Sequence, residues 1–267
     1  MPLQGADAGT LRDPDWLVPE WSLERVGALM TTRHGGSSAG PFASFNLRAS
    51  IGDDPAAVAG NQRRLASAIG AAPVWLDQVH GVRVVRLTAS DARVDALVHT
   101  ADASITTEPG VACCVQVADC LPVLFAVDDG RGVGAAHAGW RGLAGGVLEA
   151  TLEALVEAAG CAPGEVHAWL GPCIGPARFE VGPDVLQAFG VAPAANSSAR
   201  FTAAAEGKWF ADLPALAIDR LRATGVSTIS GGTWCTASDT SRFFSFRRDR
   251  ITGRMAAAVW IERDRLG

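Results

Sequence analysis

Continuous apolar runs and helically spaced apolar positions follow one another along the chain. Three runs in its middle, Val111 to Ala118, Pro122 to Val127 and Gly132 to His137, are apolar at nearly every position and are separated by short turns. This pattern predicts central strands that are buried on both faces. Helical spacing of leucines then predicts a helix from about Leu143 to Ala159, which Gly160 ends.

Shorter segments on either side of this centre extend the mixed pattern. Apolar runs bounded by turn residues predict strands, and helically spaced segments near Pro or Gly predict helices. The expected strands are Val26 to Thr32, Phe42 to Leu47, Trp75 to Val79, Val82 to Leu87, Val166 to Leu170, Val226 to Ser230, Phe243 to Phe246 and Met255 to Ile261. The expected helices are Asp53 to Gly70, Pro183 to Phe189 and Leu213 to Thr224, and a mobile surface loop is expected from Val191 to Phe201.

Composition and charge narrow the class of protein. The apolar fraction is 48% and the charged fraction 19%, as in ordinary globular domains. A net charge of -5 with scattered arginines argues against nucleic-acid binding. The first residues lack the apolar run of a secretory signal, and the longest apolar stretch, Val111 to Val127, is interrupted by Gln116 and Asp119 and is short for a membrane span. We therefore expect a cytoplasmic protein that binds neither nucleic acid nor membranes.

Three residues that end apolar strands carry chemistry suited to a metal. They are His80, Cys120 and His137, and one thiolate with two imidazoles suits zinc and leaves a fourth position open for water. Their separations of 40 residues (120 minus 80) and 17 residues (137 minus 120) form no compact metal motif. Two further interpretations stay open on the residues alone: packed histidines with a buried cysteine, or a Cys-His nucleophilic pair.

Charged residues in otherwise apolar surroundings are further candidates. Asp119 and Arg141 lie in stretches built for burial, so they are expected either to serve the site or to form a structural ion pair. Arg33 opens a loop of Gly and Ser whose backbone could cradle an anion, and Arg247 with Arg248 could offer a planar fork to phosphate. The six cysteines are too sparse for a disulfide scaffold and are expected to be mostly reduced.

A set of motifs from about Met30 to Ile261 gives a more specific indication. In chain order they are TTRHGGSSAGPFASFNL, IGDDP, LDQVHG, DALV, VADCLPVLFAVD, GAAHAGWRG, GPCIGPARFEV, WCT, FFSFRRD and TGRMA. Together they resemble the purine nucleoside phosphorylase family with the laccase-type domain, whose members are also described as polyphenol oxidases and, in one branch, as peptidoglycan-editing factors. Of these motifs, QVHG, ADC and AHAGWRG in this order are the most specific.

The resemblance implies a fold, a metal and a set of activities. The expected fold is a single α/β (α+β) domain over residues 1–267, with a core at about 26–262, in which mixed sheets are flanked by helices as in a cytotoxic-necrotizing-factor-like fold. The implied zinc ligands are His80, Cys120 and His137. The implied activities are phosphorolysis of adenosine, inosine and methylthioadenosine and deamination of adenosine, so the expected partners are purine nucleosides and phosphate.

The resemblance also directs attention to substrate contacts and to competing functions. We expect Arg33, Asn46, Arg141, Glu180 and Arg247 to bind substrate, and Asp119 or Glu180 to supply the proton that a leaving purine needs. The chain has no tyrosine, and Phe179 and Phe246 stand where relatives often carry one.

Copper is the second candidate metal, although a multicopper oxidase needs many imidazoles and the chain has five histidines. Two competing functions stay open, a Cys-His hydrolase acting on a cell-wall precursor and a binding module without activity.

Overall fold

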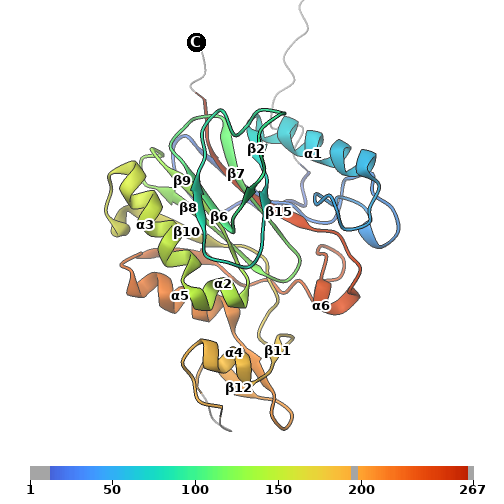
Figure 1. Ribbon diagram of the computed structural model, residues 1–267, viewed down its shortest axis with the longest axis vertical. Coiled ribbons are helices and arrows are strands. Elements are labelled where there is room, and N and C mark those ends of the chain that lie inside the picture. Colours follow the sequence, from blue (N-terminus) through green and yellow to red (C-terminus); the bar gives the residue numbers. More distant parts are fainter. Residues whose placement is uncertain (1–12, 194–197, 264–267) are drawn as a thin grey trace, which may run out of the picture.

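The computed structural model describes residues 13–193 and 198–263, and its strands form two large sheets and two small ones (Figure 1). The four-stranded sheet has the order β1 (Val26–Met30), β15 (Met255–Ile261), β7 (Val111–Val117) and β2 (Ala72–Val74). The six-stranded sheet has the order β14 (Thr228–Gly231), β10 (Val166–Leu170), β8 (Leu121–Val127), β9 (Val133–Ala138), β6 (Ala103–Thr106) and β4 (Val84–Arg86). The small sheets are β11 (Glu180–Val181), β13 (Trp209–Ala211) and β12 (Phe201–Ala203), and β3 (Leu76–Asp77) with β5 (His99–Thr100).

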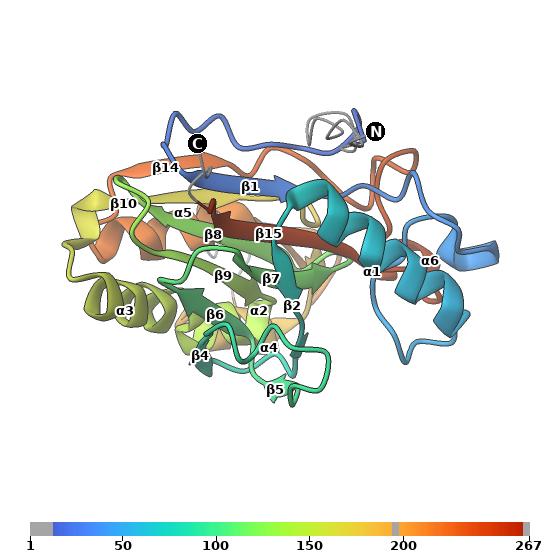
Figure 2. The same ribbon diagram turned by 90° about the horizontal axis from the view of Figure 1, so that it is seen from above.

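The two large sheets are covered on their outer faces by helices, as Figure 2 shows. Helix α1 packs on the four-stranded sheet, whereas α3 and α5 pack on the six-stranded sheet. The helices are α1 (Pro55–Ile69), α2 (Trp140–Gly145), α3 (Val147–Ala159), α4 (Pro183–Ala188), α5 (Leu213–Ala223) and α6 (Phe246–Asp249), with 3-10 turns at Gly40–Phe42 and Pro163–Glu165.

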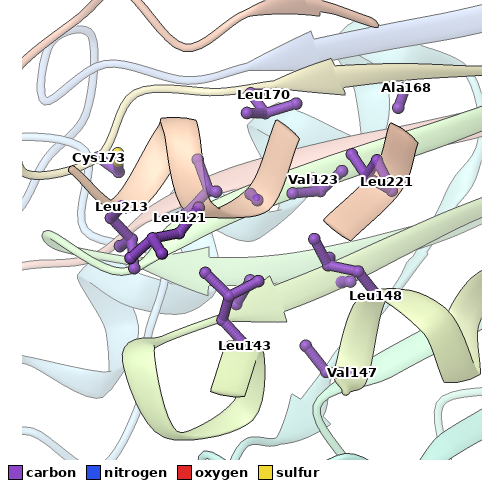
Figure 3. Packing of buried hydrophobic residues seen from close by; sticks show 14 of the residues in the cluster. Leu121, Val123, Leu143, Val147, Leu148, Ala168, Leu170, Cys173, Leu213 and Leu221 are labelled. Carbon is purple, nitrogen blue, oxygen red and sulfur yellow. The ribbon is translucent and has the colours of Figure 1, made fainter. Parts of the chain in front are cut away.

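Strand β8 shows why the central runs are apolar at nearly every position. Val123 and Phe125 belong to the cluster beneath α3 and α5, part of which Figure 3 shows, whereas Leu124 and Ala126 face the four-stranded sheet. Successive side chains of a strand point to opposite faces, so a strand between two apolar layers has no polar face. The expected α/β class with mixed sheets flanked by helices is therefore confirmed.

Most of the expected elements are present, but the helix expected from about Leu143 to Ala159 is two helices. Gly146 separates α2 from α3 with a φ of 100°, and its N–H donates to the carbonyls of Gly142 and Leu143. Glycine adopts this left-handed conformation without the steric cost that a Cβ brings. Periodicity continues across the break because both helices bury leucines against the same sheet.

Two expected strands, Phe42 to Leu47 and Phe243 to Phe246, are wrong. The apolar residues of both segments are largely buried as expected, but their backbones bond to loops rather than to a neighbouring strand. In the first, the N–H of Leu47 donates to the carbonyl of Arg254, and in the second Phe246 begins helix α6. An apolar run thus indicates that its residues are buried, but a β-ladder forms only where a partner strand is available.

Some elements have little signal in the sequence. Strand β6 and the sheet of β11, β12 and β13 are short and were not expected. The expected loop at 191–201 includes residues 194–197, which lie outside the described residues.

In the described part of the chain, no helix has the length and apolar character needed to cross a membrane.

Candidate metal centre

The three proposed ligands come from separate segments that meet where the two large sheets adjoin. His80 lies in the loop between β3 and β4, Cys120 in the turn between β7 and β8, and His137 near the end of β9. One donor atom from each lies within 4.8 Å of the other two. His137 is buried, Cys120 is half-buried and His80 is exposed, so the group opens to solvent on one side. The structure thus brings these three residues together, while their role as metal ligands stays a prediction.

A single buried carboxylate, Asp102, organises two of the three candidate ligands. It lies just before β6 and accepts hydrogen bonds from the backbone N–H groups of Val79, His80 and Gly81 at 3.2, 2.8 and 2.7 Å. Its Oδ1 is also 2.8 Å from Nδ1 of His137. His80 has a φ of 62°, a conformation that L-residues rarely adopt, and the three bonds stabilise this loop. Asp102 also orients the His137 ring so that its Nε2 is left for a metal.

The geometry of the group fits a zinc ion. Sγ of Cys120 lies 3.7 Å from Nε2 of His80, and the two imidazole rings have centroids 4.8 Å apart at an angle of 70°. Zinc bonds of about 2.0–2.3 Å in a tetrahedron separate donor atoms by about 3.5 Å. A Cys and two His are donors that zinc takes, and the open side leaves room for a fourth ligand.

The charges of the group favour a thiolate without any metal. Burial raises the pKa of Cys120, but the neighbouring His137 and His80 outweigh it and lower this pKa to about 6. Burial lowers the pKa of His137, and the thiolate of Cys120 with the carboxylate of Asp102 outweighs it and raises this pKa to about 9. The side chains therefore form a thiolate-imidazolium pair near neutral pH, the deprotonated thiol being the form that binds metals.

Two cavities adjoin this group and share His80, Ala118, Cys120 and Phe246. The first, which we call the arginine lobe, has a volume of about 380 Å³, and the second, the aromatic lobe, about 240 Å³. The arginine lobe is also lined by Arg48, Ile51, Gln78, Gln116, Val117, His137 and Arg254. The aromatic lobe is also lined by Asp119, Trp140, Arg141, Ile174, Phe179, Leu213 and Arg247.

The arginine lobe concentrates positive charge beside the candidate metal group. Arg48 and Arg254 both line it, and neither is fully exposed. Burial and then the charge of Arg48 lower the pKa of Arg254. Arg254 donates to the carbonyls of Thr252 and Gly253 and has no carboxylate partner among the described residues, while Arg48 is 3.9 Å from Asp77. Two crowded cations with little compensation make a site for an anion.

The aromatic lobe presents flat apolar surfaces with an arginine on two of them. The guanidinium carbon of Arg141 lies 4.2 Å from the ring centroid of Trp140, and that of Arg247 lies 5.3 Å from the ring centroid of Phe179. Arg247 also donates to the carbonyl of Glu180 at 2.8 Å. Rings of this kind stack on planar ligands, and the phenylalanines do so without a hydroxyl group.

Asp119 has a structural use that the sequence does not indicate. Its carboxylate accepts hydrogen bonds from the hydroxyls of Thr236 and Ser245 and from the backbone N–H of Arg247. Asp119 therefore holds the start of α6, and the ion pair considered with Arg141 is not formed. With three donors on it, this carboxylate positions the segments that line the cleft.

Three of the expected substrate contacts are absent from the cleft. Arg33 donates to the carbonyls of Ala43 and Thr240, lies over a phenylalanine ring and lines neither lobe. Asn46 is fully buried, where it accepts from the N–H of Arg254 and so holds that loop from behind. Glu180 offers its carbonyl to Arg247, but its side chain lines neither lobe. Of that group, Arg141 and Arg247 reach the cleft.

Sequence reasoning missed Arg48, Arg254 and Asp102. Arg254 lies in the TGRMA motif directly before β15, and Asp102 stands between two buried alanines. Both are charged residues beside apolar strands. Asp119 was singled out because it is charged and lies in an apolar stretch, and the same argument could have found Arg254 and Asp102. Arg48 has no such signal, because it follows a segment whose path depends on tertiary contacts.

Comparisons with known proteins show the family of this chain and agree with its fold. A sequence profile described as multi-copper polyphenol oxidoreductase laccase matches residues 27–262. A purine nucleoside phosphorylase of Pseudomonas aeruginosa is 50% identical over 248 residues, covering 92% of this chain and 98% of that protein. The purine nucleoside phosphorylase YfiH of Escherichia coli is 46% identical with the same coverage.

Solved structures resemble the whole fold. The Neisseria meningitidis protein NMB0706 has a TM-score of 0.85 and 43% identity, covering 93% of this chain and 100% of its own. YlmD of Geobacillus stearothermophilus has a TM-score of 0.85 and 34% identity, covering 93% and 96%. This chain therefore belongs to the laccase-type family whose profile spans it, and similar proteins from several bacteria carry the name purine nucleoside phosphorylase.

Proposed function

We propose that this protein is a zinc-dependent purine nucleoside phosphorylase that also deaminates adenosine, with adenosine, inosine and methylthioadenosine as substrates. The names of its relatives support the reaction class. The observation that carries the proposal is the pair Arg48 and Arg254 in a cavity that also contains all three candidate metal ligands.

In this proposal each lobe binds a different part of the substrates. Phosphate binds in the arginine lobe, where Arg48 and Arg254 offer guanidinium donors and phosphate reduces their mutual repulsion. The purine binds in the aromatic lobe against Trp140, Phe179 and Phe246, whose rings stack on a base and exclude water. The ribose then lies at the junction that His80 and Cys120 share.

Phosphorolysis breaks the bond between the ribose and the purine, and both lobes act on this bond. Phosphorolysis places an anionic nucleophile against a sugar that becomes cationic, so positioning and electrostatic stabilisation supply much of the rate. Arg48 and Arg254 orient phosphate, and the aromatic lobe holds the purine in a fixed plane. Zinc bound by His80, Cys120 and His137 would supply a water of lowered pKa for deamination.

A comparison of arginine variants tests the phosphate site. In Arg254→Gln and Arg48→Gln we expect the KM for phosphate to rise about tenfold or more, because a hydrogen bond to a charged group contributes ~1.5–3 kcal/mol. The KM for the nucleoside is expected to change little. Arg33→Gln is the matched control, since Arg33 lines neither lobe. Equal losses of affinity for nucleoside and phosphate in the first two variants would refute the division of the cleft.

A hydrolase that uses Cys120 as nucleophile is a second candidate, because Asp102, His137 and Cys120 form a chain of interactions typical of a Cys-His-Asp triad. In the metal-free protein the thiolate of Cys120 could attack an amide of a cell-wall precursor. Chelation distinguishes the two functions, because it is expected to abolish a zinc reaction and to preserve a thiol reaction.

A multicopper oxidase is not supported by the donor set. Among the described residues, the group of His80, Cys120 and His137 is the one that gathers three or more metal-binding side chains. It provides two imidazoles, whereas coupled copper centres need many. Copper could replace zinc in this single site, and metal analysis of protein purified without added metal decides between them.

A further inference from the structure

Two cysteines outside the candidate metal centre lie next to each other on adjacent segments. Cys173 follows β10 and Cys235 follows β14, the strand that pairs with β10. The two residues are direct partners in a parallel β-bridge. Neighbouring strands lie about 4.8 Å apart, which is within the range of about 4.4–6.8 Å between the Cα atoms of a disulfide. Both side chains contact the same apolar cluster, in which Figure 3 shows the sulfur of Cys173.

The two thiols differ in access to solvent. Cys173 is fully buried, whereas Cys235 is half-buried and lines a separate surface cavity of about 490 Å³. Hydroxyl residues and Arg242 form much of the remaining wall of this cavity. A small polar solute can therefore reach Cys235, whereas burial shields Cys173 from it.

The surroundings of Cys235 favour its reactive form. The backbone N–H of Gly175 donates to its Sγ at 3.2 Å. A Cβ at Gly175 would lie 3.3 Å from this sulfur and 3.0 Å from the Cβ of Cys235, so a glycine suits this close approach. Burial raises the pKa of Cys235, but hydrogen bonds from Ser238 and Gly175 outweigh it and lower the pKa. The thiolate is the nucleophilic form of a cysteine.

We propose that Cys173 and Cys235 form a reversible disulfide when the protein meets a hydroperoxide. The Cys235 thiolate attacks one peroxide oxygen, so an S–O bond forms, the O–O bond breaks, and hydroxide or an alkoxide leaves, which takes up a proton from water. The Cys173 sulfur then attacks the sulfenic sulfur of Cys235, so the S–S bond forms and the S–O bond breaks. The departing hydroxide takes the proton of Cys173 as water. The two thiols lose two electrons and the peroxide gains them.

Closure of this disulfide acts on segments that hold the metal centre. The residue after Cys173, Ile174, donates its N–H to the carbonyl of Asp119 at 2.9 Å, and the residue after Cys235, Thr236, donates its hydroxyl to the Asp119 carboxylate at 2.6 Å. Asp119 directly precedes Cys120. A shift of both segments therefore changes the position of Cys120. This consequence rests on the proposed metal site, whereas the disulfide does not.

Peroxide titration followed by peptide mass spectrometry tests the disulfide. Zinc-loaded protein is treated with hydrogen peroxide, its free thiols are alkylated without reduction, and the digested peptides are identified. We expect a cross-linked Cys173-Cys235 peptide that dithiothreitol removes, and a fall from six free thiols to four under denaturing conditions, since the chain has six cysteines and two are used. Zinc release is expected to become about tenfold faster, as when a contact behind a metal ligand is lost.

Three variants test which cysteines form the cross-link. Cys235→Ser is expected to abolish the cross-link, and Cys173→Ala to leave a sulfenic acid on Cys235 that dimedone traps. Cys161→Ser, which removes another half-buried cysteine, is the matched control and should still form the cross-link. Six free thiols after oxidation of the wild type, or a cross-link that contains Cys120, would overturn the proposal. A cross-link without faster zinc release would leave the disulfide standing and refute its connection to the metal centre.

Discussion

At the scale of single residues, the candidate centre depends on Asp102 as much as on the residues that would touch a metal. This carboxylate fixes the left-handed backbone at His80 and the ring of His137. In Asp102→Asn we expect zinc affinity to fall about 10- to 100-fold, because an amide cannot accept from all these donors and therefore holds the His80 loop and the His137 ring less firmly. Competition with a chromogenic chelator measures this affinity.

Asp128→Asn is the matched control for Asp102→Asn. Asp128 also accepts from a histidine, His167, but the pair lies on the surface and away from the cleft. Equal zinc affinity in wild type and Asp102→Asn would show that the carboxylate supports only the fold.

The pKa values of the site predict how zinc binding depends on pH. The pKa of His137 is raised to about 9, so its ring carries a proton at neutral pH that a metal has to displace, whereas Cys120 with a pKa of about 6 is already ionised. We expect the apparent zinc affinity to rise about tenfold per pH unit from about pH 7 to about pH 9, with one proton released, and to level off above. Chelator competition at several pH values measures the slope, and a flat profile over this range would contradict the assignment of His137.

At the scale of elements, the turn from β9 into α2 leaves no room for a side chain. A Cβ at Gly139 would lie 2.8 Å from Cδ2 of His80 and 3.1 Å from Sγ of Cys120. We expect Gly139→Ala to displace both ligands, to lower zinc affinity at least about tenfold and to leave the folded core intact. Gly164→Ala is the control, because a Cβ there would meet only a carbonyl at 4.0 Å. Wild-type zinc affinity in Gly139→Ala would show that the ligands do not meet as described.

Long apolar strands with two buried faces could be predicted from the sequence, whereas buried segments whose backbone bonds to loops could not. Strands β7, β8 and β9 are apolar at nearly every position because two layers cover them. By contrast, Phe45 and Phe244 are just as buried but lie in segments whose backbones bond to loops. The break at Gly146 depends on one φ angle, which periodicity does not report.

The same distinction holds for the candidate site. His80, Cys120 and His137 end predicted strands, their residue types suit zinc, and the family resemblance implied them as its ligands. The anion site was expected at Arg33, but that guanidinium is held by the carbonyls of Ala43 and Thr240. Arg48 and Arg254 are far apart in the sequence but line the same cavity, and only the tertiary fold brings them there.

At the scale of the whole molecule, the cleft lies where two sheets meet, and the core does not depend on it. Three apolar clusters fill the space between the sheets and beneath the helices. We therefore expect Cys120→Ala to lose stoichiometric zinc while its free energy of unfolding, compared in the metal-free state, stays within about 1 kcal/mol of the wild type. Metal analysis and urea unfolding test this, and a variant that keeps one zinc per chain would show that Cys120 is not a ligand.

The most direct test of the proposed function is to follow all products of the purified protein with and without phosphate. Zinc-loaded wild type and Cys120→Ala are incubated with inosine and with adenosine, and bases, nucleosides and ribose 1-phosphate are separated by chromatography. We predict base and ribose 1-phosphate in equal amounts only when phosphate is present, inosine from adenosine even without phosphate, and none of these products from Cys120→Ala. Base release that does not need phosphate, or equal product formation by Cys120→Ala, would contradict the proposed function.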